Sequence, residues 1–297
     1  MKILIIGSGG RLGAALHRAY QQKFDVTGLS HGQVDLSDFD ELEEVVKRLN
    51  FDLLINCAAF TNVDMCEEQQ DEAFRVNAGA PDVLAEICEA KDVRMIHFST
   101  DYVFNGEKKT PYVEEDEADP ISVYGQSKKE GEDAVLAADE RNLVIRVSWV
   151  FGPERRSFID NIIERARQNE RVAAVLDKFS TPTYTRDLAE MLPKFFDVDK
   201  TDGGLLHYSS SGECSWKEYA QHAIDCCHQA GVALKAKTVD ALTLKDMTTW
   251  VARRPPYSVL STAKYQALTG VTPRPWQDAV AEYVREFVCS RGQPVAL

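Results

Sequence analysis

The 297-residue sequence contains no hydrophobic run long enough to cross a membrane. Its longest apolar runs, such as ILII at residues 3–6, have the length of β-strands. The opening MKILIIGSGG has too short an apolar run for a secretory signal peptide, and it ends in glycines. With 44% hydrophobic residues, the composition is typical of a soluble globular protein, which we expect in the cytoplasm.

Disulfide and metal-binding patterns are missing too. The seven cysteines form no Cys-x-x-Cys motif, and Cys57 and Cys88 lie in apolar segments, so we expect buried, reduced thiols. Adjacent helix residues such as Cys226 and Cys227 point in different directions, which disfavours a redox pair. The six histidines lack zinc-ligand spacing, and the acidic run at residues 113–120 is typical of a solvated loop. No metal site is predicted.

Positive charge is scarce. The chain has 34 Lys and Arg residues but 47 Asp and Glu residues, which gives a net charge of −13. A nucleic-acid partner is disfavoured because no basic stripe is available to neutralise phosphates. A small anionic ligand remains compatible with this charge, since a few arginines or backbone N–H groups suffice to bind it.

Strand-like and helix-like segments alternate in the first half of the chain. Strands are predicted at residues 2–7, 25–30, 52–59, 93–99 and 142–149, and helices at residues 11–22, 38–49, 70–90 and 123–138. This alternation predicts an α/β fold with a Rossmann-like, doubly wound parallel sheet covered on both faces.

The pattern changes after about residue 150. Helical segments at residues 158–168, 186–196 and 215–231 are separated by loops rich in proline. We expect a dinucleotide-binding domain over residues 1–150 and a smaller, partly irregular, mainly substrate-binding lobe over residues 151–297. The boundary is soft, and the chain can cross it again.

A glycine loop follows the first predicted strand. Gly7-Ser8-Gly9-Gly10-Arg11-Leu12-Gly13 gives Gly-x-x-Gly-x-x-Gly at the start of a predicted helix. Glycine allows a tight turn and close approach of the backbone to a pyrophosphate, and the helix N-terminus offers free N–H groups. The loop predicts a dinucleotide site.

The end of the second predicted strand bears on the choice of dinucleotide. The strand ends in Leu29-Ser30-His31 and lacks the carboxylate that bonds the ribose 2′-hydroxyl of NAD. Arg11 and His31 could instead meet a 2′-phosphate, so NADP(H) is favoured and NAD(H) remains possible. Asp35 and Leu36 are expected near the adenine, although a helix cap in the same segment is equally ordinary.

Tyr124 and Lys128 form a Tyr-x-x-x-Lys motif at the start of a predicted helix, so both lie on one face. A phenol with a pKa of about 10 exchanges protons poorly at neutral pH, and a nearby ammonium lowers that pKa. A second hydroxyl could hold the substrate oxygen while a hydride reaches the carbon. The pair therefore points to carbonyl reduction with a nicotinamide cofactor.

These motifs together resemble the extended short-chain dehydrogenases/reductases. Within that superfamily, nearly the whole chain resembles the dTDP-4-dehydrorhamnose reductase family. The matching stretches are STDYVF at residues 99–104, SVYGQSK at 122–128, RVSWVFG at 146–152, TPTYTRDLA at 181–189 and ARRPPYSVLS at 252–261.

The resemblance implies NAD(P)H-dependent reduction of the C4 keto group of a nucleotide-linked 4-dehydro-6-deoxysugar, above all dTDP-4-dehydro-L-rhamnose. It makes Tyr124 the proton donor and Thr100 the residue that positions the carbonyl oxygen, while Lys128 also holds the nicotinamide ribose. Ser99 and the 56–59 segment, with Cys57, Ala58 and Ala59, would contact the cofactor.

The same resemblance implies a set of substrate contacts, namely Thr61, Val63, Asp101, Tyr102, Phe104, Trp149 and Arg253. Simpler explanations remain open for four of them: loop packing for Tyr102 and Phe104, a core position for Trp149, and a surface salt bridge for Arg253.

Other functions remain open at this point. The fold also resembles the non-catalytic β subunit of methionine adenosyltransferase, which the intact Thr100, Tyr124 and Lys128 disfavour. An epimerase or dehydratase of another sugar nucleotide is a further alternative, but Tyr102 stands where dehydratases carry a glutamate. A homodimer is possible.

Overall fold

The computed structural model describes residues 1–197 and 203–289. Its central sheet has six parallel strands in the order β10-β5-β4-β3-β1-β2. These strands are β1 Lys2–Ile6, β2 Asp25–Leu29, β3 Leu53–Asn56, β4 Arg94–Thr100, β5 Leu143–Val147 and β10 Gly204–His207. The predicted doubly wound Rossmann-like fold is confirmed.

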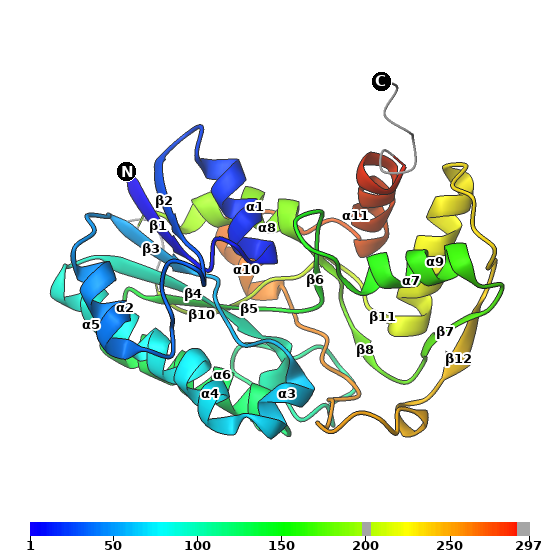
Figure 1. The fold of residues 1–297 in the computed structure, drawn as a ribbon, viewed down its shortest axis with the longest axis horizontal. Helices are drawn as coiled ribbons and strands as arrows, with labels where there is room; N and C mark the ends of the chain where they lie inside the picture. Colours follow the sequence, from blue (N-terminus) through cyan, green and yellow to red (C-terminus); the bar gives the residue numbers. More distant parts are fainter. Residues whose placement is uncertain (198–202, 290–297) are drawn as a thin grey trace.

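Helices cover both faces of this sheet, as Figure 1 shows. On one face lie α1 Arg11–Tyr20, α8 Thr185–Met191 with the 3₁₀ turn η3 Leu192–Phe195, and α10 Ala263–Thr269. On the other lie α2 Phe39–Lys47, α5 Ala80–Ala90 and α6 Val123–Ala138. Two buried apolar layers therefore enclose the sheet.

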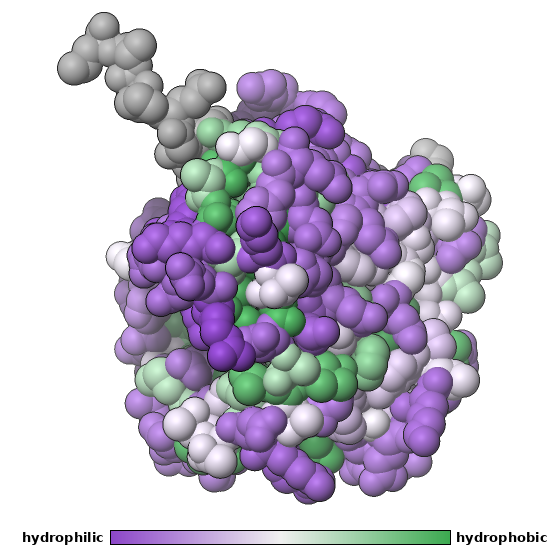
Figure 2. All heavy atoms as spheres, turned by 90° about the vertical axis from the view of Figure 1, so that its right-hand side faces the viewer, coloured by the Kyte–Doolittle hydropathy of each residue, from purple (hydrophilic) through white to green (hydrophobic). Residues whose placement is uncertain are grey.

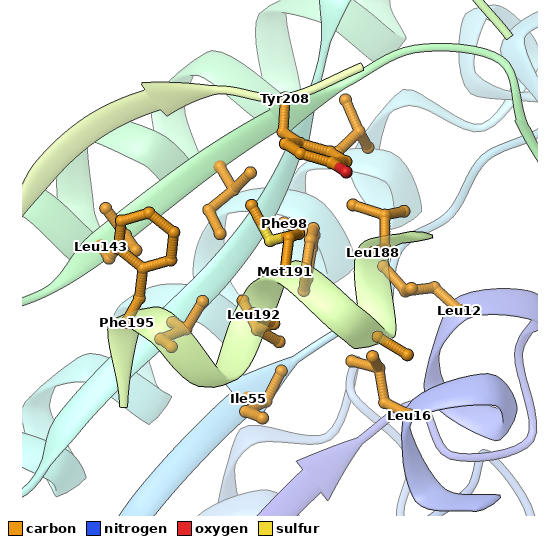
Figure 3. Packing of buried hydrophobic residues seen from close by; sticks show 14 of the residues in the cluster. Leu12, Leu16, Ile55, Phe98, Leu143, Leu188, Met191, Leu192, Phe195 and Tyr208 are labelled. Carbon is orange, nitrogen blue, oxygen red and sulfur yellow. The ribbon is translucent and has the colours of Figure 1, made fainter. Parts of the chain in front are cut away.

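Alternation along the strands produces these two layers. Ile3 and Ile5 of β1 pack in the layer under α1 and α8, whereas Leu4 and Ile6 pack in the layer over α2 and α5. Figure 3 shows the first layer, in which side chains of α1 and α8 meet those of the sheet. The sheet is thereby fixed as a rigid base for the loops at its edge.

Strand β10 was not predicted. It lies beyond residue 150, yet it pairs in parallel with β5, so the second half of the chain returns to the sheet. The backbone N–H of Gly204 donates to the carbonyl of Asn142 at 2.7 Å and sets this register. A four-residue strand gives too short a periodic signal to be recognised in the sequence.

The predicted helix over residues 70–90 is interrupted. The chain forms α4 Gln70–Phe74, a π-helical turn η1 Arg75–Gly79 and then α5. Pro81 stands at the start of α5 and has no N–H for a regular α-helical bond, which is consistent with wider winding just before it. The π turn places Asn77 against α6, where its side chain contacts Ser127.

Most of the remaining elements form a smaller lobe, whereas helix α3 Val63–Glu68 packs against α4 and α6. Its helices are α7 Phe158–Gln168, α9 Trp216–Gln229 and α11 Trp276–Tyr283, the last followed by the π turn η5 Val284–Val288. Its paired strands are β7 Val172–Val175 with β12 Val239–Leu242, β8 Phe179–Ser180 with β11 Cys214–Ser215, and β6 Val150–Phe151 with β9 Thr183–Tyr184. The lobe has its own apolar core between α7, α9 and α11.

Figure 2 views the molecule from the side of this lobe, where an apolar strip crosses a mostly hydrophilic face. Of the residues expected in the lobe, 290–297 and 198–202 lie outside the described residues. In the part of the chain that is described, no helix has the length and hydrophobicity needed to span a membrane. The seven cysteines, all within that part, are free thiols.

Candidate active site

A cleft of about 1110 Å³ opens at the carboxyl ends of β1, β3 and β4. The strand order changes direction at β1, because β2 lies on one side of it and β3 on the other. Loops from neighbouring strands diverge at such a point, and ligands of doubly wound sheets bind in the resulting crevice. Most of the residues predicted as cofactor and substrate contacts line this cleft.

The glycine loop forms the floor of the cleft. Gly7 has φ +80°, and a Cβ at this position would lie 2.7 Å from the backbone nitrogen of Ala58. Gly13 packs below the loop, where a Cβ would lie 2.2 Å from the Gly7 carbonyl oxygen. Gly9, Gly10 and Leu12 line the cleft, whereas Gly13 supports them from behind.

The residues present fit a dinucleotide. Helix α1 begins at Arg11 with Gly10 as its N-cap and no side-chain cap from the described residues, so its first turn can receive an anion. The Ser99 hydroxyl lines the cleft and is buried, but it has no hydrogen-bond partner within residues 1–197 and 203–289. A buried hydroxyl of this kind is suited to a ligand contact.

Arg11 differs from its predicted role. It lines the cleft, but its guanidinium donates to the carbonyl oxygens of Val150 at 3.2 Å, Arg155 at 3.3 Å and Arg156 at 2.6 Å. Burial lowers its pKa. These bonds tie α1 to the 150–156 segment, which makes Arg11 an anchor for that segment.

Two arginines that were not predicted from the sequence could take the role expected of Arg11 beside a 2′-phosphate. Arg155 and Arg156 are exposed and line the cleft. A Cβ on Gly9 would lie 3.9 Å from Arg155 Nη2, so this guanidinium reaches over the glycine loop. The adjacent arginines were visible in the sequence just before α7, but only folding brings them to the loop.

Ser30, His31, Asp35 and Leu36 lie together on the adenosine side of the cleft. Asp35 Oδ1 accepts hydrogen bonds from the backbone and hydroxyl of Ser37, both at 2.9 Å, and these bonds lower the pKa of Asp35. The neighbouring Asp38 caps α2, as the sequence had allowed. β2 ends without a carboxylate.

Thr100 and Tyr124 meet in the cleft. Thr100 ends β4, and Tyr124 lies in the first turn of α6, whose N-cap Ser122 accepts from the N–H of Gly125. The nearby Thr100 hydroxyl lowers the pKa of Tyr124, but burial has the larger effect and raises it. The phenol is therefore held protonated in the cofactor-free protein.

Lys128 lies one turn beyond Tyr124 and also lines the cleft. Its Nζ lies 2.9 Å from His97 Nε2 and donates to the carbonyl of Phe98 at 2.8 Å. In the structure this nitrogen faces His97, and its expected effect on the pKa of Tyr124 stays a prediction. Burial lowers the pKa of Lys128 to about 8.

Aromatic side chains form the opposite wall. Tyr102 and Trp149 line the cleft, and the Tyr102 ring meets Tyr124 edge-on at a centroid distance of 5.6 Å. Trp149 has φ +41°, a left-handed conformation that is costly for a large residue and that clusters at functional sites. Behind both rings lies Lys178, with Nζ 4.8 Å from the Tyr102 centroid and 6.0 Å from that of Trp149.

Asp101 lies at the edge of the cleft with its carboxylate occupied by the protein. Its Oδ2 accepts from Ser180 at 3.1 Å and from Ser258 at 2.5 Å, and its Oδ1 accepts from Thr100 at 3.2 Å. Burial raises its pKa, and the charge of Lys178 opposes that change. These bonds join β4, β8 and the 255–258 segment.

Thr61 and Val63 line the cleft, as expected. Two other expected substrate contacts do not. Phe104 is fully buried and stacks on Tyr112 at 4.0 Å, because it lies beyond the turn after β4 and faces the core. Arg253 is exposed outside the cleft.

The arginine next to Arg253 has a defined partner. Arg254 pairs with Asp64 at 2.7 Å, and the hydrogen bond from Arg254 is the main cause that lowers the pKa of Asp64 to about 2. Asp64 also accepts from the backbone N–H groups of Val251 and Ala252, both at 2.9 Å. The first turn of α3, which carries Asp64, is thereby fastened to the 251–254 segment.

A family model described as the RmlD substrate binding domain matches residues 1–289. The chain belongs to this family. Its sequence is 35% identical to dTDP-4-dehydrorhamnose reductase of Mycolicibacterium smegmatis, over 97% of this chain and 86% of that protein. It is 34% identical to the spore coat polysaccharide biosynthesis protein SpsK of Bacillus subtilis, over 96% and 97%.

A solved structure agrees with this RmlD-family assignment. The crystal structure of dTDP-4-dehydrorhamnose reductase from Bacillus anthracis in complex with NADP matches with a TM-score of 0.89 and 26% identity. The match covers 96% of this chain and 99% of that one. The resemblance inferred from the motifs is confirmed at the level of family and fold.

In this RmlD-family chain, several buried residues behind the cleft escaped the sequence analysis. Asn77 donates to the Ser127 hydroxyl at 3.1 Å, and it exchanges hydrogen bonds with the backbone of Phe60. It clamps the 60-loop to α6. Like His97 and Lys178, Asn77 lies in an apolar or ordinary context in the sequence, and its partners are distant along the chain.

Metal binding was not expected from the sequence. Across residues 1–197 and 203–289, no group of three or more His, Cys, Asp or Glu side chains is arranged to hold a metal ion.

Proposed function

We propose that this chain uses NADPH to reduce the C4 keto group of a nucleotide-linked 4-dehydro-6-deoxysugar, with dTDP-4-dehydro-L-rhamnose as the first candidate. The observation that carries the proposal is the meeting of Thr100 and Tyr124 in one cleft with the glycine loop. The relatives named as dTDP-4-dehydrorhamnose reductases support the substrate class.

The cofactor side of the cleft favours NADPH, with NADH as an alternative. The Gly7–Leu12 loop and the first turn of α1 would hold the pyrophosphate. Arg155 and His31 are exposed, line the cleft and would meet a 2′-phosphate, and the end of β2 offers no carboxylate to repel it. When bound, NADPH supplies the hydride.

The protein's own groups would supply and hold the proton. Burial raises the pKa of Tyr124, so the phenol is protonated and its proton is available to the more strongly basic alkoxide. Thr100 lines the same cleft near Tyr124, and its hydroxyl would hold the same oxygen. Lys128 would bind the nicotinamide ribose, and Ser99, Cys57, Ala58 and Ala59 would border the ring, since all of them line the cleft.

The sugar would lie between the 61–63 loop and the aromatic wall. Thr61 and Val63 approach from one side, and Tyr102 and Trp149 from the other. The Trp149 indole N–H is buried without a hydrogen-bond partner among the described residues, so it is suited to donate to a sugar hydroxyl. Asp101 would orient Thr100 rather than touch the substrate.

In this proposal residues 1–150 mainly bind the dinucleotide and residues 151–297 mainly bind the sugar nucleotide, in the cytoplasm. The Arg11 bonds to the 150–156 segment join these two regions at the cleft. A homodimer, and the absence of a nucleic-acid partner, stay predictions.

The test is an assay of NADPH absorbance with purified protein and enzymatically prepared dTDP-4-dehydro-L-rhamnose. We expect NADPH to be consumed in a one-to-one ratio with the sugar, and dTDP-L-rhamnose to form. Omission of the sugar is the control. If NADPH is bound but not consumed with this or related 4-keto sugar nucleotides, the proposed reaction is wrong.

A further inference from the structure

A row of four hydrogen-bonding contacts runs beneath the cleft from β3 to β4 through α6. Asn56 Oδ1 accepts from the N–H of Ala58 at 3.0 Å, and Asn56 Nδ2 lies 3.1 Å from His97 Nδ1. His97 Nε2 lies 2.9 Å from Lys128 Nζ, which in turn donates to the carbonyl of Phe98 at 2.8 Å. The row begins at a backbone donor and ends at a backbone acceptor.

These two backbone groups fix the direction of each contact. The Ala58 N–H can only donate, so the amide oxygen of Asn56 faces it and the amide NH₂ faces His97. Nδ1 of His97 is then an acceptor, and the neutral ring carries its proton on Nε2. This Nε2–H points at Lys128, whose nitrogen accepts it through a lone pair. A lysine nitrogen has a lone pair only as the neutral amine.

The opposite direction would place two donors face to face. An ammonium at Lys128 needs Nε2 as its acceptor, and Nδ1–H then needs the oxygen of Asn56. The amide NH₂ would in that case face the N–H of Ala58. Ala58 cannot easily move away, because it packs against the glycine loop with its nitrogen 2.7 Å from the position of a Cβ on Gly7.

Burial destabilises the ammonium form of Lys128. The residue is 1% exposed, and burial is the main cause that lowers its pKa to about 8, so the neutral amine predominates above this pH. Glu132 on the same helix raises this pKa, but its carboxylate is engaged by Arg146 of β5 at 2.6 Å. Cys57, at the end of β3, is the other titratable group that raises it. His97 on β4 has a lowered pKa of its own, because of burial and of Lys128.

We propose that His97, oriented by Asn56, is a positioning residue that holds Lys128 as a neutral amine in the cofactor-free protein at alkaline pH. Lys128 is released toward the cleft when its own side-chain nitrogen binds a proton. The proton comes from solution and adds to the lone pair of Nζ, while His97 stays neutral with its proton on Nε2. The contact then breaks because an ammonium and an Nε2–H are both donors. The ammonium turns to acceptors in the cleft, which Lys128 already lines.

This inference deepens the proposed function and rests on it for the ligand that receives Lys128. It gives His97 a task in cofactor binding although the ring does not line the cleft, and it predicts that NADPH binding above about pH 8 is accompanied by proton uptake. The direction of proton exchange follows from the pKa of Lys128. Above this pKa the free protein holds mostly the amine, whereas the complex with an anionic cofactor holds the ammonium. Binding therefore takes up a proton.

The first experiment is nitrogen-15 NMR of the histidine rings in the full-length, cofactor-free protein. His97→Gln assigns the His97 signal, and if that variant does not fold, the five other single His→Gln variants assign it by elimination. At a pH above about 8, where Lys128 is mostly the amine, we expect a protonated Nε2 and an unprotonated Nδ1 for His97. A proton on Nδ1 would overturn the proposal whether or not the protein is a reductase.

The second experiment uses Asn56→Asp to reverse the direction of the hydrogen bonds along the row. A carboxylate accepts from Nδ1–H, so Nε2 becomes the acceptor for an ammonium, which Lys128 should then hold before cofactor binds. Calorimetric titration with NADPH in buffers of different ionisation enthalpy measures proton uptake. Above about pH 8 we expect clear uptake in the wild type and a several-fold smaller uptake in Asn56→Asp.

His228→Gln is the matched control, because this histidine lies on α9 and bonds the carbonyl of Ala236 at 3.1 Å, away from the row. It should keep wild-type proton uptake. Equal uptake in wild type and Asn56→Asp would contradict the positioning role. If NADPH fails to bind the wild type, the proposed function fails, and the tautomer of His97 still decides the positioning role.

Discussion

Tyr124 is surrounded by apolar and aromatic groups, with the Thr100 hydroxyl as its polar neighbour. Burial penalises the phenolate more strongly than the Thr100 hydroxyl favours it, so the phenol keeps its proton at neutral pH. A raised pKa makes the phenol a weaker acid, but the alkoxide formed in reduction is a stronger base than a phenolate. The protonated phenol can therefore still protonate the alkoxide.

Tyr124→Phe removes this proton and leaves the ring packing in place. We expect kcat to fall by at least about 100-fold, the scale of lost general acid catalysis, with little change in NADPH affinity. Steady-state kinetics and cofactor titration measure the two effects. Tyr112→Phe is a matched control, since that ring stacks on Phe104 outside the cleft. Near-normal turnover in Tyr124→Phe would remove Tyr124 from its assigned role.

At the level of single residues, the sequence revealed the groups that belong to local motifs. Thr100, Tyr124 and Lys128 were found in this way, and the structure brings all three to one cleft. His97 was not found, because a histidine within an apolar strand is an ordinary core residue unless its partner is known. Its partner Lys128 is 31 positions away along the chain.

At the level of elements, the link between β1 and α1 carries the cofactor site. Gly7 needs a positive φ and has no room for a Cβ against Ala58. The loop is thereby pressed onto the end of β3, and the first turn of α1 faces the cleft. The geometry of one turn thus sets where a pyrophosphate can bind.

Gly7→Ala should lower NADPH affinity by at least about 10-fold and destabilise the fold by about 1–3 kcal/mol, because it adds a clash to an unfavourable φ. Gly231→Ala separates the effect of the clash from the effect of the positive φ. Gly231 has φ +74° but open space around a Cβ, so its alanine variant should lose about 1 kcal/mol and keep wild-type affinity. Titration with NADPH and denaturant unfolding test both variants. Similar behaviour of the two would contradict the role of the close contact.

Among the elements, long periodic segments were predicted and short or irregular ones were not. The five strands of the first half and helix α6 follow from hydrophobic patterns. The two-residue strands β6, β8, β9 and β11 have no pattern of their own and form where distant segments meet. The π turn before α5 was also missed, since Pro81 signals a break in a helix but not its kind.

At the level of the whole molecule, three polar contacts join segments that are far apart in sequence. Arg11 holds the 150–156 segment, Asp64 holds the 251–254 segment, and Asp101 holds Ser180 and Ser258. All three involve residues in or beside the cleft, so the cleft depends on the docking of the smaller lobe. A single sequence cannot show such pairs, which is why Arg11 was assigned to the cofactor.

Two buried lysines make the stability of the molecule depend on pH. Burial lowers the pKa of Lys128 and of Lys178 from 10.5 to about 8. Between these values the unfolded chain binds more protons than the folded one, so this contribution to the unfolding free energy rises with pH from about 8 to 10.5. Below about pH 8 both lysines are charged in the folded and the unfolded chain, so the full cost of burying these charges lowers the unfolding free energy.

Lys178→Met should therefore flatten the rise of the unfolding free energy between about pH 8 and 10, by on the order of 1–3 kcal/mol. Denaturant unfolding across this pH range measures the change. The same substitution at the exposed Lys194 provides the control and should leave the wild-type slope intact. A pH dependence in Lys178→Met that runs parallel to that of the wild type would contradict this account.

The central claim is that the cleft brings a nicotinamide hydride to C4 of the sugar while Tyr124 protonates its oxygen. The most direct measurement uses NADPH that carries deuterium at the transferred position, followed by NMR of the sugar product. The account predicts deuterium bonded to C4 of the product from the wild-type protein. A product with deuterium elsewhere, or with hydrogen from water at C4, would contradict it.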